Sequence, residues 1–454
     1  MDSSIILHFI LSGDILRVVA AWIWQGLLAT WWFVVPLILF YIFAEYWVNY
    51  ITLEFKKKIQ WVFLEVKVPR DVETTPKAME QVFSGFYGIM SSPLPQERFF
   101  KGKVPLWVSF EIVGDKGGIH FYIVTPKEFR RLVETQFYSQ YPQVEIREVE
   151  NYTKRFTALP NGFYDTWGAQ LQFIKESVYP IKTYPFFEEI KDEKRLDSLS
   201  SLLETLSHLR DGEEIWIQMV FRPLTLTQLK AWEDQAKGKV QELMGKKPAP
   251  AAPSGGAVDT VIDFSNQVKN SFGDALRDII SSIAGGVFAS SSASAPVKEE
   301  KKEERVDLSP GQRHAIEDLE KKVAKPVFET VIRTMYVAPR GIFDKGSQSA
   351  AIRAYFQTFN IAGLNGFMEK VKLYVDWKRF WKLNFQIQDL KMLFIFYNFR
   401  VCPDPDEKDM LKKMILSSEE LATLYHFPIS SVSAPGLSRT GVKKSEPPHN
   451  LPLI

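Results

Sequence analysis

A long apolar run lies near the N-terminus of the chain. Residues 27–44 read LLATWWFVVPLILFYIFA and contain no charged side chain. A helix rises by about 1.5 Å per residue, so a run of this length crosses most of the hydrocarbon core of a bilayer. The pattern predicts a single transmembrane helix over residues 27–50.

The residues that follow this run have the composition of a membrane interface. Aromatic side chains favour the headgroup region, and basic residues are in excess on the cytoplasmic side of a span. We therefore expect a single-pass membrane protein with a large cytoplasmic C-terminal body. Glu45 ends the apolar run rather than interrupting it, which favours an interfacial carboxylate over an intramembrane functional acid. The residues expected at this interface are Glu45, Tyr46, Trp47, Tyr50, Lys56, Lys57 and Lys58.

Residues 1–26 are expected to form an N-terminal tail and an interfacial helix. Asp2 and Asp14 replace the basic start of a secretory signal peptide, so we expect the segment to stay attached. Residues 15–26 are apolar but too few for a second span with a turn. They fit an interfacial helix or an extension of the same helix.

After residue 60 the pattern alternates between strand and helix periods. Gly114, Gly117 and Gly118 predict a tight hairpin, and Thr125 with Glu128 has the spacing of a capping box. The expected elements are a strand over 61–68, a helix from Thr75, strands over 107–113 and 119–124, a helix from Thr125 and a strand over 143–149. This βαββαβ order predicts a ferredoxin-like domain over residues 61–150 in an α+β protein.

A second unit of the same kind is expected from two separated stretches, 168–225 and 326–400. Its candidate elements are a short strand over 171–174, a leucine-rich helix over 199–209, strands over 214–221 and 328–337, and a helix over 350–359. The plan is complete only if residues 226–325 are an insertion. Residues 401–454 are expected to be a C-terminal connector.

The insertion is expected to be a helical arm with flexible linkers. Residues 226–244 and 311–325 have polar helical patterns, whereas 248–256 and 298–305 are too rich in Pro, Gly or charge to pack. Between these linkers, residues 259–288 predict an amphipathic helix that docks on a partner or the membrane, or else packs on its own domain. Its apolar face comprises Phe264, Val268, Phe272, Leu276, Ile279 and Ile283. The flexible linkers favour docking, and the mixed charges favour a protein groove.

Composition narrows the chemistry. With 56 basic and 54 acidic side chains the formal charge is +2, so we expect contact with nucleic acid only indirectly. One cysteine, Cys402, forms no internal disulfide and is expected to be an inert thiol. The six histidines are far apart in sequence, and no phosphate-binding loop or nucleophile elbow occurs. We expect no cofactor, no metal and no catalytic residues.

Several passages resemble the membrane-anchored N-terminal region of bacterial type IV secretion DNA-translocating ATPases, relatives of the conjugative coupling proteins. They are FLEVKVPRDVETTPKAMEQVF from Phe63, GGIHFYIVTP from Gly117, DGEEIWIQMVFRP from Asp211, LSSEELATLYHFP from Leu416 and EPPHNLP from Glu446. The last two resemble the connector into the ATPase core. No phosphate or magnesium ligand of that family has a matching position here, so the resemblance does not extend to ATP binding.

The resemblance implies a non-catalytic membrane anchor or scaffold for a DNA-translocating ATPase in a secretion or conjugation apparatus. The expected partners are the membrane, a separate ATPase subunit and further copies of this chain; a truncated, non-motor relative is the other option. The alternative function is a membrane-bound small-ligand sensor, because paired ferredoxin-like modules also serve that purpose and fold does not determine function.

Overall fold

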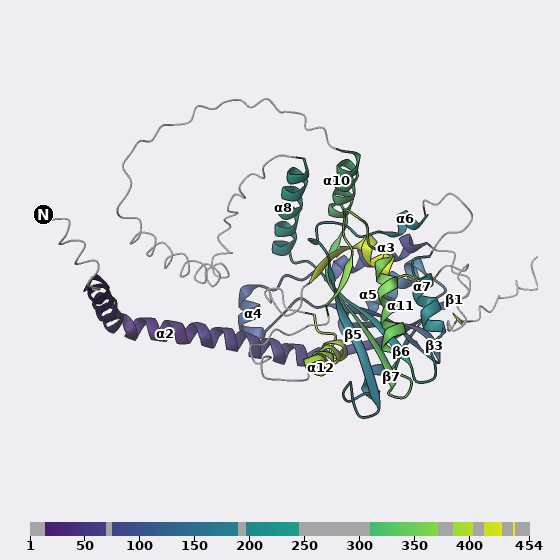
Figure 1. Ribbon diagram of the computed structural model, residues 1–454, viewed down its shortest axis with the longest axis horizontal. Coiled ribbons are helices and arrows are strands. Elements are labelled where there is room, and N and C mark those ends of the chain that lie inside the picture. Colours follow the sequence, from purple (N-terminus) through teal and green to yellow (C-terminus); the bar gives the residue numbers. More distant parts are fainter. Residues whose placement is uncertain are drawn as a thin grey trace, which may run out of the picture. The chain divides into compact units, whose positions relative to one another are not determined.

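An apolar helix and a large antiparallel sheet are the main structural elements of the protein (Figure 1). The computed structural model describes residues 14–69, 75–188, 197–244, 309–370, 385–402, 413–428 and 439–440. The chain divides into two compact units. Unit 1 comprises Met1–Ile59 and Pro93–Val104, and unit 2 comprises Gln60–Ser92 and Pro105–Ile454.

Unit 1 contains two helices, α2 (Asp14–Lys58) and the short α4 (Pro95–Lys101). Helix α2 continues through Pro36 and ends in three lysines. Residues 15–26 therefore extend the same helix, which was one of the two readings of their sequence. The long apolar N-terminal helix is confirmed.

Unit 2 is a mixed α+β structure around one sheet. Nine strands pair antiparallel, and the two-residue β10 pairs parallel with the end of β1. The strands are β1 (Trp61–Pro69), β2 (Val108–Asp115), β3 (Gly118–Pro126), β4 (Glu145–Glu148), β5 (Tyr164–Phe173), β6 (Glu214–Pro223), β7 (Val327–Pro339), β8 (Phe367–Lys370), β9 (Met414–Ser417) and β10 (Arg439–Thr440).

The strand order has an internal symmetry. Strands β4, β1, β3 and β2 are neighbours in that order, and β8, β5, β7 and β6 are neighbours in the corresponding order. The two sets join where β2 pairs with β6, from Val108 opposite Phe221 to Gly114 opposite Ile215. The expected hairpin is confirmed, with Asp115 opposite Gly118. Gly118 has φ +131°, a value that glycine adopts without a steric penalty.

Helices cover both faces of the sheet. One face carries the main hydrophobic core, to which α3 (Pro76–Phe86), α5 (Arg130–Gln140), α7 (Ser200–Ser207), α11 (Lys345–Gln357) and α13 (Ser418–Leu424) contribute. The opposite face is covered by α12 (Phe385–Asn398), whose Leu393, Phe394 and Tyr397 pack with Trp216 of β6. The short helix α6 (Tyr184–Glu188) and the 3-10 turns η1 (Tyr87–Ile89), η2 (Lys127–Phe129) and η3 (Tyr152–Arg155) complete the unit.

Two sequence-based expectations about element boundaries are wrong. Thr125 does not cap a helix, because β3 continues to Pro126 and α5 begins only after the turn η2, with Phe129 at its N-cap. The strand expected over 171–174 begins at Tyr164, because β5 pairs with β7 from Tyr164 to Gln170. In both cases pairing with a strand that is distant in sequence decides the boundary, and it overrides the conformation that the neighbouring residues favour.

A helical arm follows β6 and precedes β7. Helices α8 (Leu226–Leu243) and α10 (Pro310–Val323) lie side by side, with Ala236 and Leu319 buried between them (Figure 1). Each begins with a capping box, Thr225 with Gln228 and Ser309 with Gln312. The amphipathic helix expected over 259–288 and both linkers lie outside the described residues.

Part of the C-terminal segment belongs to the core. Strand β9 pairs with the start of β7, and α13 packs against α3. Leu416, Leu421 and Tyr425 are fully buried. The stretch from Met414 to Phe427, expected to lie in a connector, therefore contributes to the fold of unit 2.

Candidate functional site

Helix α2 carries many exposed apolar side chains in the part of it that the structure describes. From Trp31 to Lys58 it is the one helix among the described residues that is long and apolar enough to cross a membrane, and none of its most apolar window is buried. Trp32, Phe40 and Phe43 are each more than half exposed. By length and composition this helix fits either a membrane span or a signal sequence.

The residues expected at the interface lie in the last four turns of α2. Glu45, Tyr46 and Tyr50 are exposed, whereas Trp47 is half-buried. The Trp47 ring stacks on Phe43 with the ring centres 5.9 Å apart. Lys56, Lys57 and Lys58 form the last turn, where cations are favourable to the helix dipole. Lys57 Nζ lies 2.8 Å from Glu54 Oε1.

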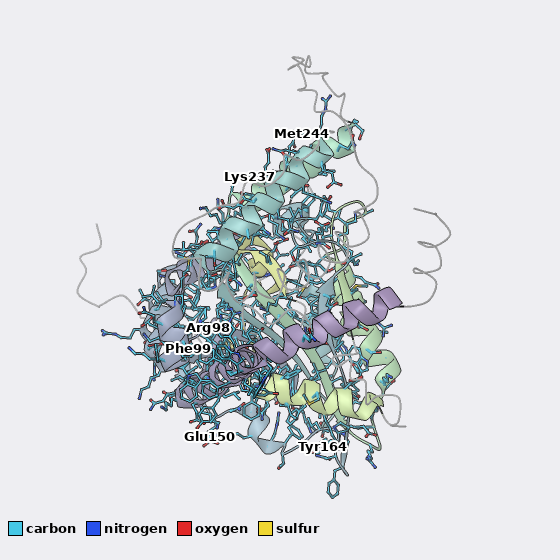
Figure 2. All side chains as sticks on the ribbon, turned by 90° about the vertical axis from the view of Figure 1, so that its left-hand side faces the viewer. Arg98, Phe99, Glu150, Tyr164, Lys237 and Met244 are labelled. Carbon is cyan, nitrogen blue, oxygen red and sulfur yellow. The ribbon has the colours of Figure 1, made fainter. Side chains whose placement is uncertain are left out.

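Helix α4 packs against the same turns of α2. The indole N–H of Trp47 donates to the carbonyl oxygen of Phe99 at 3.1 Å. Gly102 ends α4 in the left-handed conformation, with φ +63°. Its amide donates to the carbonyl of Arg98, and the amide of Lys103 donates to that of Glu97. A Cβ at Gly102 would lie 2.3 Å from the carbonyl oxygen of Ile51, so glycine is also required by the close approach of α2. Figure 2 labels Arg98 and Phe99 on this helix.

Helix α4 was not among the elements expected from the sequence. Leu94 and Phe100 are 59% and 72% exposed, and Arg98, Lys101 and Lys103 lie beside them. The available signal was Pro95 at a first helical turn, with Gly102 at its end. Only the folded chain brings this segment against α2, because the two are separated by β1 and α3 in sequence.

The α12 side of the sheet carries a buried ion pair. Arg400 Nε and Nη2 donate to Glu111 Oε1 and Oε2 at 2.9 and 3.0 Å, and both side chains are fully enclosed. Burial alone would raise the pKa of Glu111, but the charge and hydrogen bonds of Arg400 outweigh it and hold the pKa below its usual value. Glu111 is therefore a carboxylate in the folded protein.

Neutral donors complete the shell of Glu111. The hydroxyl of Ser109 and the amide of Gln218 donate to Oε1 at 2.7 and 2.9 Å, and the phenol of Tyr152 donates to Oε2 at 2.7 Å. Every carboxylate lone pair is thus satisfied. With these contacts made, the cluster is suited to holding α12 on the sheet.

The carbonyl end of α12 meets this cluster. Gln218 donates to the carbonyl of Tyr397, Arg400 donates to that of Asn398, and Arg333 donates to those of Phe396 and Val401. A helix leaves its last carbonyls without partners inside the helix, and cations are favourable there. Burial lowers the pKa of the Arg333 guanidinium to about 10, which leaves it charged at neutral pH.

A second polar group lies at the β2–β3 hairpin. His120 Nδ1 is 2.7 Å from Glu65 Oε1, and its Nε2 is 3.6 Å from Asp115 Oδ1. The two carboxylates raise the pKa of His120 to about 9, so the ring is an imidazolium at neutral pH. It stacks on Tyr122 with the planes 13° apart. A charged, paired ring of this kind is not poised to act as a general base near pH 7.

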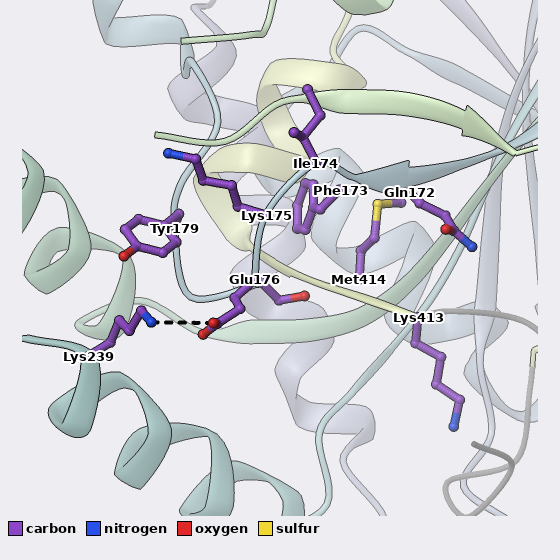
Figure 3. Close-up of a pocket in the computed structure, with 10 residues that line it drawn as sticks. Gln172, Phe173, Ile174, Lys175, Glu176, Tyr179, Lys239, Lys413 and Met414 are labelled. Atoms are coloured by element: carbon purple, nitrogen blue, oxygen red, sulfur yellow. Dashed lines mark hydrogen bonds and ion pairs between the residues drawn. The ribbon is translucent and has the colours of Figure 1, made fainter. Parts of the chain in front are cut away.

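A cavity of about 630 Å³ lies beside the end of β5. Figure 3 shows its lining, which includes Lys175, Lys239 and Lys413 together with apolar side chains such as Phe173 and Met414. Lys239 Nζ lies 3.3 Å from Glu176, Lys413 Nζ lies 3.0 Å from Glu329, and Lys175 Nζ lies 2.6 Å from the carbonyl of Gly363. An anion would have to compete with these contacts.

Three further sequence-based expectations concern Cys402, metal binding and the docking face. Cys402 is 1% exposed, and burial raises the pKa of its thiol, so it is unreactive in the folded protein. Within the described ranges no cluster of three His, Cys, Asp or Glu side chains could hold a metal ion. The six residues of the expected docking face, Phe264 to Ile283, lie outside the described residues.

Comparison with known proteins gives a family but no activity. No curated protein matches the chain. A family profile described as a domain of unknown function matches residues 51–341, from the last turns of α2 to the turn after β7, which is well over half of the chain. The chain therefore belongs to the family described as Domain of unknown function (DUF8128).

Proposed function

We propose that this protein is a membrane-anchored, non-catalytic scaffold for a DNA-translocating ATPase in a secretion or conjugation apparatus. The observation that carries the anchoring role is the link between α2 and β1. Helix α2 ends at Lys58 and β1 begins at Trp61, so two residues connect an apolar helix to a large folded unit. Such a short link restricts how far that unit can move from a bilayer.

The resemblance to the ATPase anchors supports the choice of partner. Four of its five passages fall in unit 2, on β1 with α3, on β3, on β6, and on β9 with α13; residues 70–74 of the first passage lie outside the described residues. These elements meet in one sheet and one hydrophobic core. The resemblance therefore falls on strands and helices of unit 2 that share a sheet and a core.

We also propose that unit 2 consists of two ferredoxin-like repeats. A βαββαβ unit of this class has its strands in the order 4-1-3-2, and both halves of the sheet have this order, the second with the α8–α10 arm inserted. Joining two such units through β2 and β6 removes one exposed edge from each, which suppresses unwanted strand pairing.

The proposed location is the inner membrane, crossed once, with unit 2 in the cytoplasm. The three lysines at the end of α2 support this orientation. Protease added to right-side-out spheroplasts should leave everything after Lys58 intact, while lysed membranes should lose it. Cleavage of unit 2 in intact spheroplasts, or release of a mature form lacking α2, would contradict this topology.

The ATPase partner is tested by isolation of the full chain from its native membrane in mild detergent. We expect a hexamer-forming ATPase to copurify in stoichiometric amount, several copies of this chain to be present, and DNA to be retained only through the ATPase. A preparation that contains this chain alone, together with a neighbouring reading frame that encodes no phosphate-loop ATPase, would sink the scaffold proposal.

The second candidate is a membrane-bound sensor of a small ligand, and the cavity beside β5 favours it. Screening the detergent-solubilised chain against metabolites by thermal shift separates the two functions. A concentration-dependent rise in melting temperature that is lost in Lys239→Met would support the sensor, because a ligand that binds only the folded state stabilises it.

A further inference from the structure

Helix α4 and its flanking residues expose apolar side chains that the anchoring of α2 does not explain. Two large apolar side chains of this twelve-residue segment, Leu94 and Phe100, are 59% and 72% exposed to solvent. We propose that Pro93–Val104 is a second membrane contact, with Leu94 and Phe100 in the headgroup region of an anionic leaflet. The inference rests on the proposed membrane span of α2.

The position of α4 on α2 supports this contact. The carbonyl of Phe99 accepts from Trp47, and the turn at Gly102 lies against Ile51. Trp47 belongs to the aromatic residues at the end of the apolar run, where indole and phenol rings favour the interface. Helix α4 is therefore held at the depth along α2 at which the bilayer gives way to water.

Both described helices of unit 1 carry exposed apolar side chains. Tyr46, Tyr50 and Leu53 are 73%, 60% and 57% exposed, and Leu94 and Phe100 add to them on the second helix. A single exposed apolar residue is ordinary on a protein surface. Five exposed apolar side chains on two packed helices, three of them in the last turns of the candidate span, fit a surface that contacts lipid rather than water.

The basic residues of this segment favour an anionic lipid surface as its binding partner. Residues 93–104 contain Arg98, Lys101 and Lys103 but one acid, Glu97, which pairs with Lys103 at 2.6 Å. The last turn of α2 adds three lysines. Basic residues next to a span are attracted to the anionic lipids of the cytoplasmic leaflet. A protein groove of the same shape would need a matching acidic rim.

The chain path gives this contact a consequence. The polypeptide passes between unit 1 and unit 2 three times, after Ile59, after Ser92 and after Val104. Because α4 already packs on α2, lipid bound at α4 would hold the chain near the membrane at the second and third of these links as well as at the first.

The test uses the full chain in vesicles containing phosphatidylglycerol. Because Cys402 is 1% exposed, one introduced cysteine can be labelled selectively with an environment-sensitive fluorophore. Phe100→Cys and Leu94→Cys report on α4, Phe40→Cys reports on the apolar part of α2, and Lys116→Cys at the exposed hairpin is the aqueous reference. Lipids with quenchers at shallow and deep positions give the depth of each label.

We expect shallow quenchers to quench labels at positions 94 and 100 at least threefold more strongly than the label at 116. The label at position 40 should respond most to deep quenchers. If position 40 is quenched and position 100 is no more quenched than 116, the second contact is wrong while anchoring stands. If position 40 is not quenched either, the membrane anchor itself is wrong.

A pair of substitutions tests the chemistry of the contact. Phe100→Ser with Lys101→Glu should lower quenching of the label at position 94 at least twofold and leave position 40 unchanged. The matched control is Phe163→Ser with Lys116→Glu, which alters an exposed phenylalanine and lysine of unit 2. Equal quenching in the test and control variants would overturn the proposal, as would equal quenching in vesicles without anionic lipid.

Discussion

Arg400 forms a two-point ion pair with Glu111 across 289 residues of sequence, and it does so from a left-handed backbone conformation. Its φ is +47°, the one positive φ of a non-glycine residue in the described part of the chain. A left-handed conformation costs a non-glycine residue roughly 1–2 kcal/mol. The guanidinium at the end of α12 offsets this cost through its contacts with the sheet.

Replacing Glu111 by Gln should destabilise unit 2 by about 3–5 kcal/mol, because Arg400 would remain buried without its counter-charge. Denaturant unfolding of the detergent-solubilised chain gives the difference. Lys116→Gln, which removes an exposed ion pair with Asp211, should cost less than about 1 kcal/mol. Equal losses in the two variants would show that the buried pair has no special role.

The same carboxylate gives an acid dependence of stability. The pKa of Glu111 is lower in the folded state than in the unfolded chain, so its contribution is present above the unfolded value of 4.5 and is lost as the pH falls further. The stability difference between wild type and Glu111→Gln should therefore shrink in acid. A difference that does not change from pH 7 to the acid limit of folding would argue against this assignment.

His120 should give a dependence of the opposite sign. Its folded pKa of about 9 exceeds the model-peptide value of 6.5, so its stabilisation is fully present below pH 6.5 and is lost as the pH rises through 9. His120→Gln should destabilise the protein at pH 6 and have little effect at pH 9.5. Unfolding free energies at the two pH values decide the point; an effect that is the same at both would remove the charged histidine from consideration.

Gly102→Ala should detach α4 from α2. A side chain at this position requires a left-handed backbone and would meet the carbonyl of Ile51, so the Trp47–Phe99 hydrogen bond should be lost. In detergent, trypsin should then cleave after Lys101 several-fold faster than in the wild type. Gly238→Ala in α8, where a Cβ has open space, should leave this rate unchanged.

Replacing Phe272 and Ile279 by Asp should abolish recruitment of a partner if residues 259–288 form a docking helix. Membrane insertion and the melting temperature of unit 2 should stay as in the wild type, because neither substitution touches its described core. Copurification and differential scanning calorimetry measure the two effects. If the double substitution unfolds unit 2, the helix is part of the core of that unit and the docking prediction is wrong.

The sequence alone determined the features that depend on neighbouring residues. The apolar run predicts α2, because eighteen consecutive residues without a charge are typical of a membrane-spanning helix. The glycines after Val113 predict the β2–β3 hairpin, and the polar helical pattern over residues 311–325 predicts α10. Each of these signals acts within a few residues, where steric limits and capping hydrogen bonds decide the conformation.

Tertiary structure decided everything that depends on distant partners. Glu111 reads in sequence as a polar residue in a strand, and only the fold of unit 2 brings Arg400, Tyr152 and Gln218 around it. The contact of α4 with α2 likewise depends on the fold, because a strand and a helix separate the two in sequence. Buried polar groups and close helix contacts are set by long-range packing, which local periodicity does not encode.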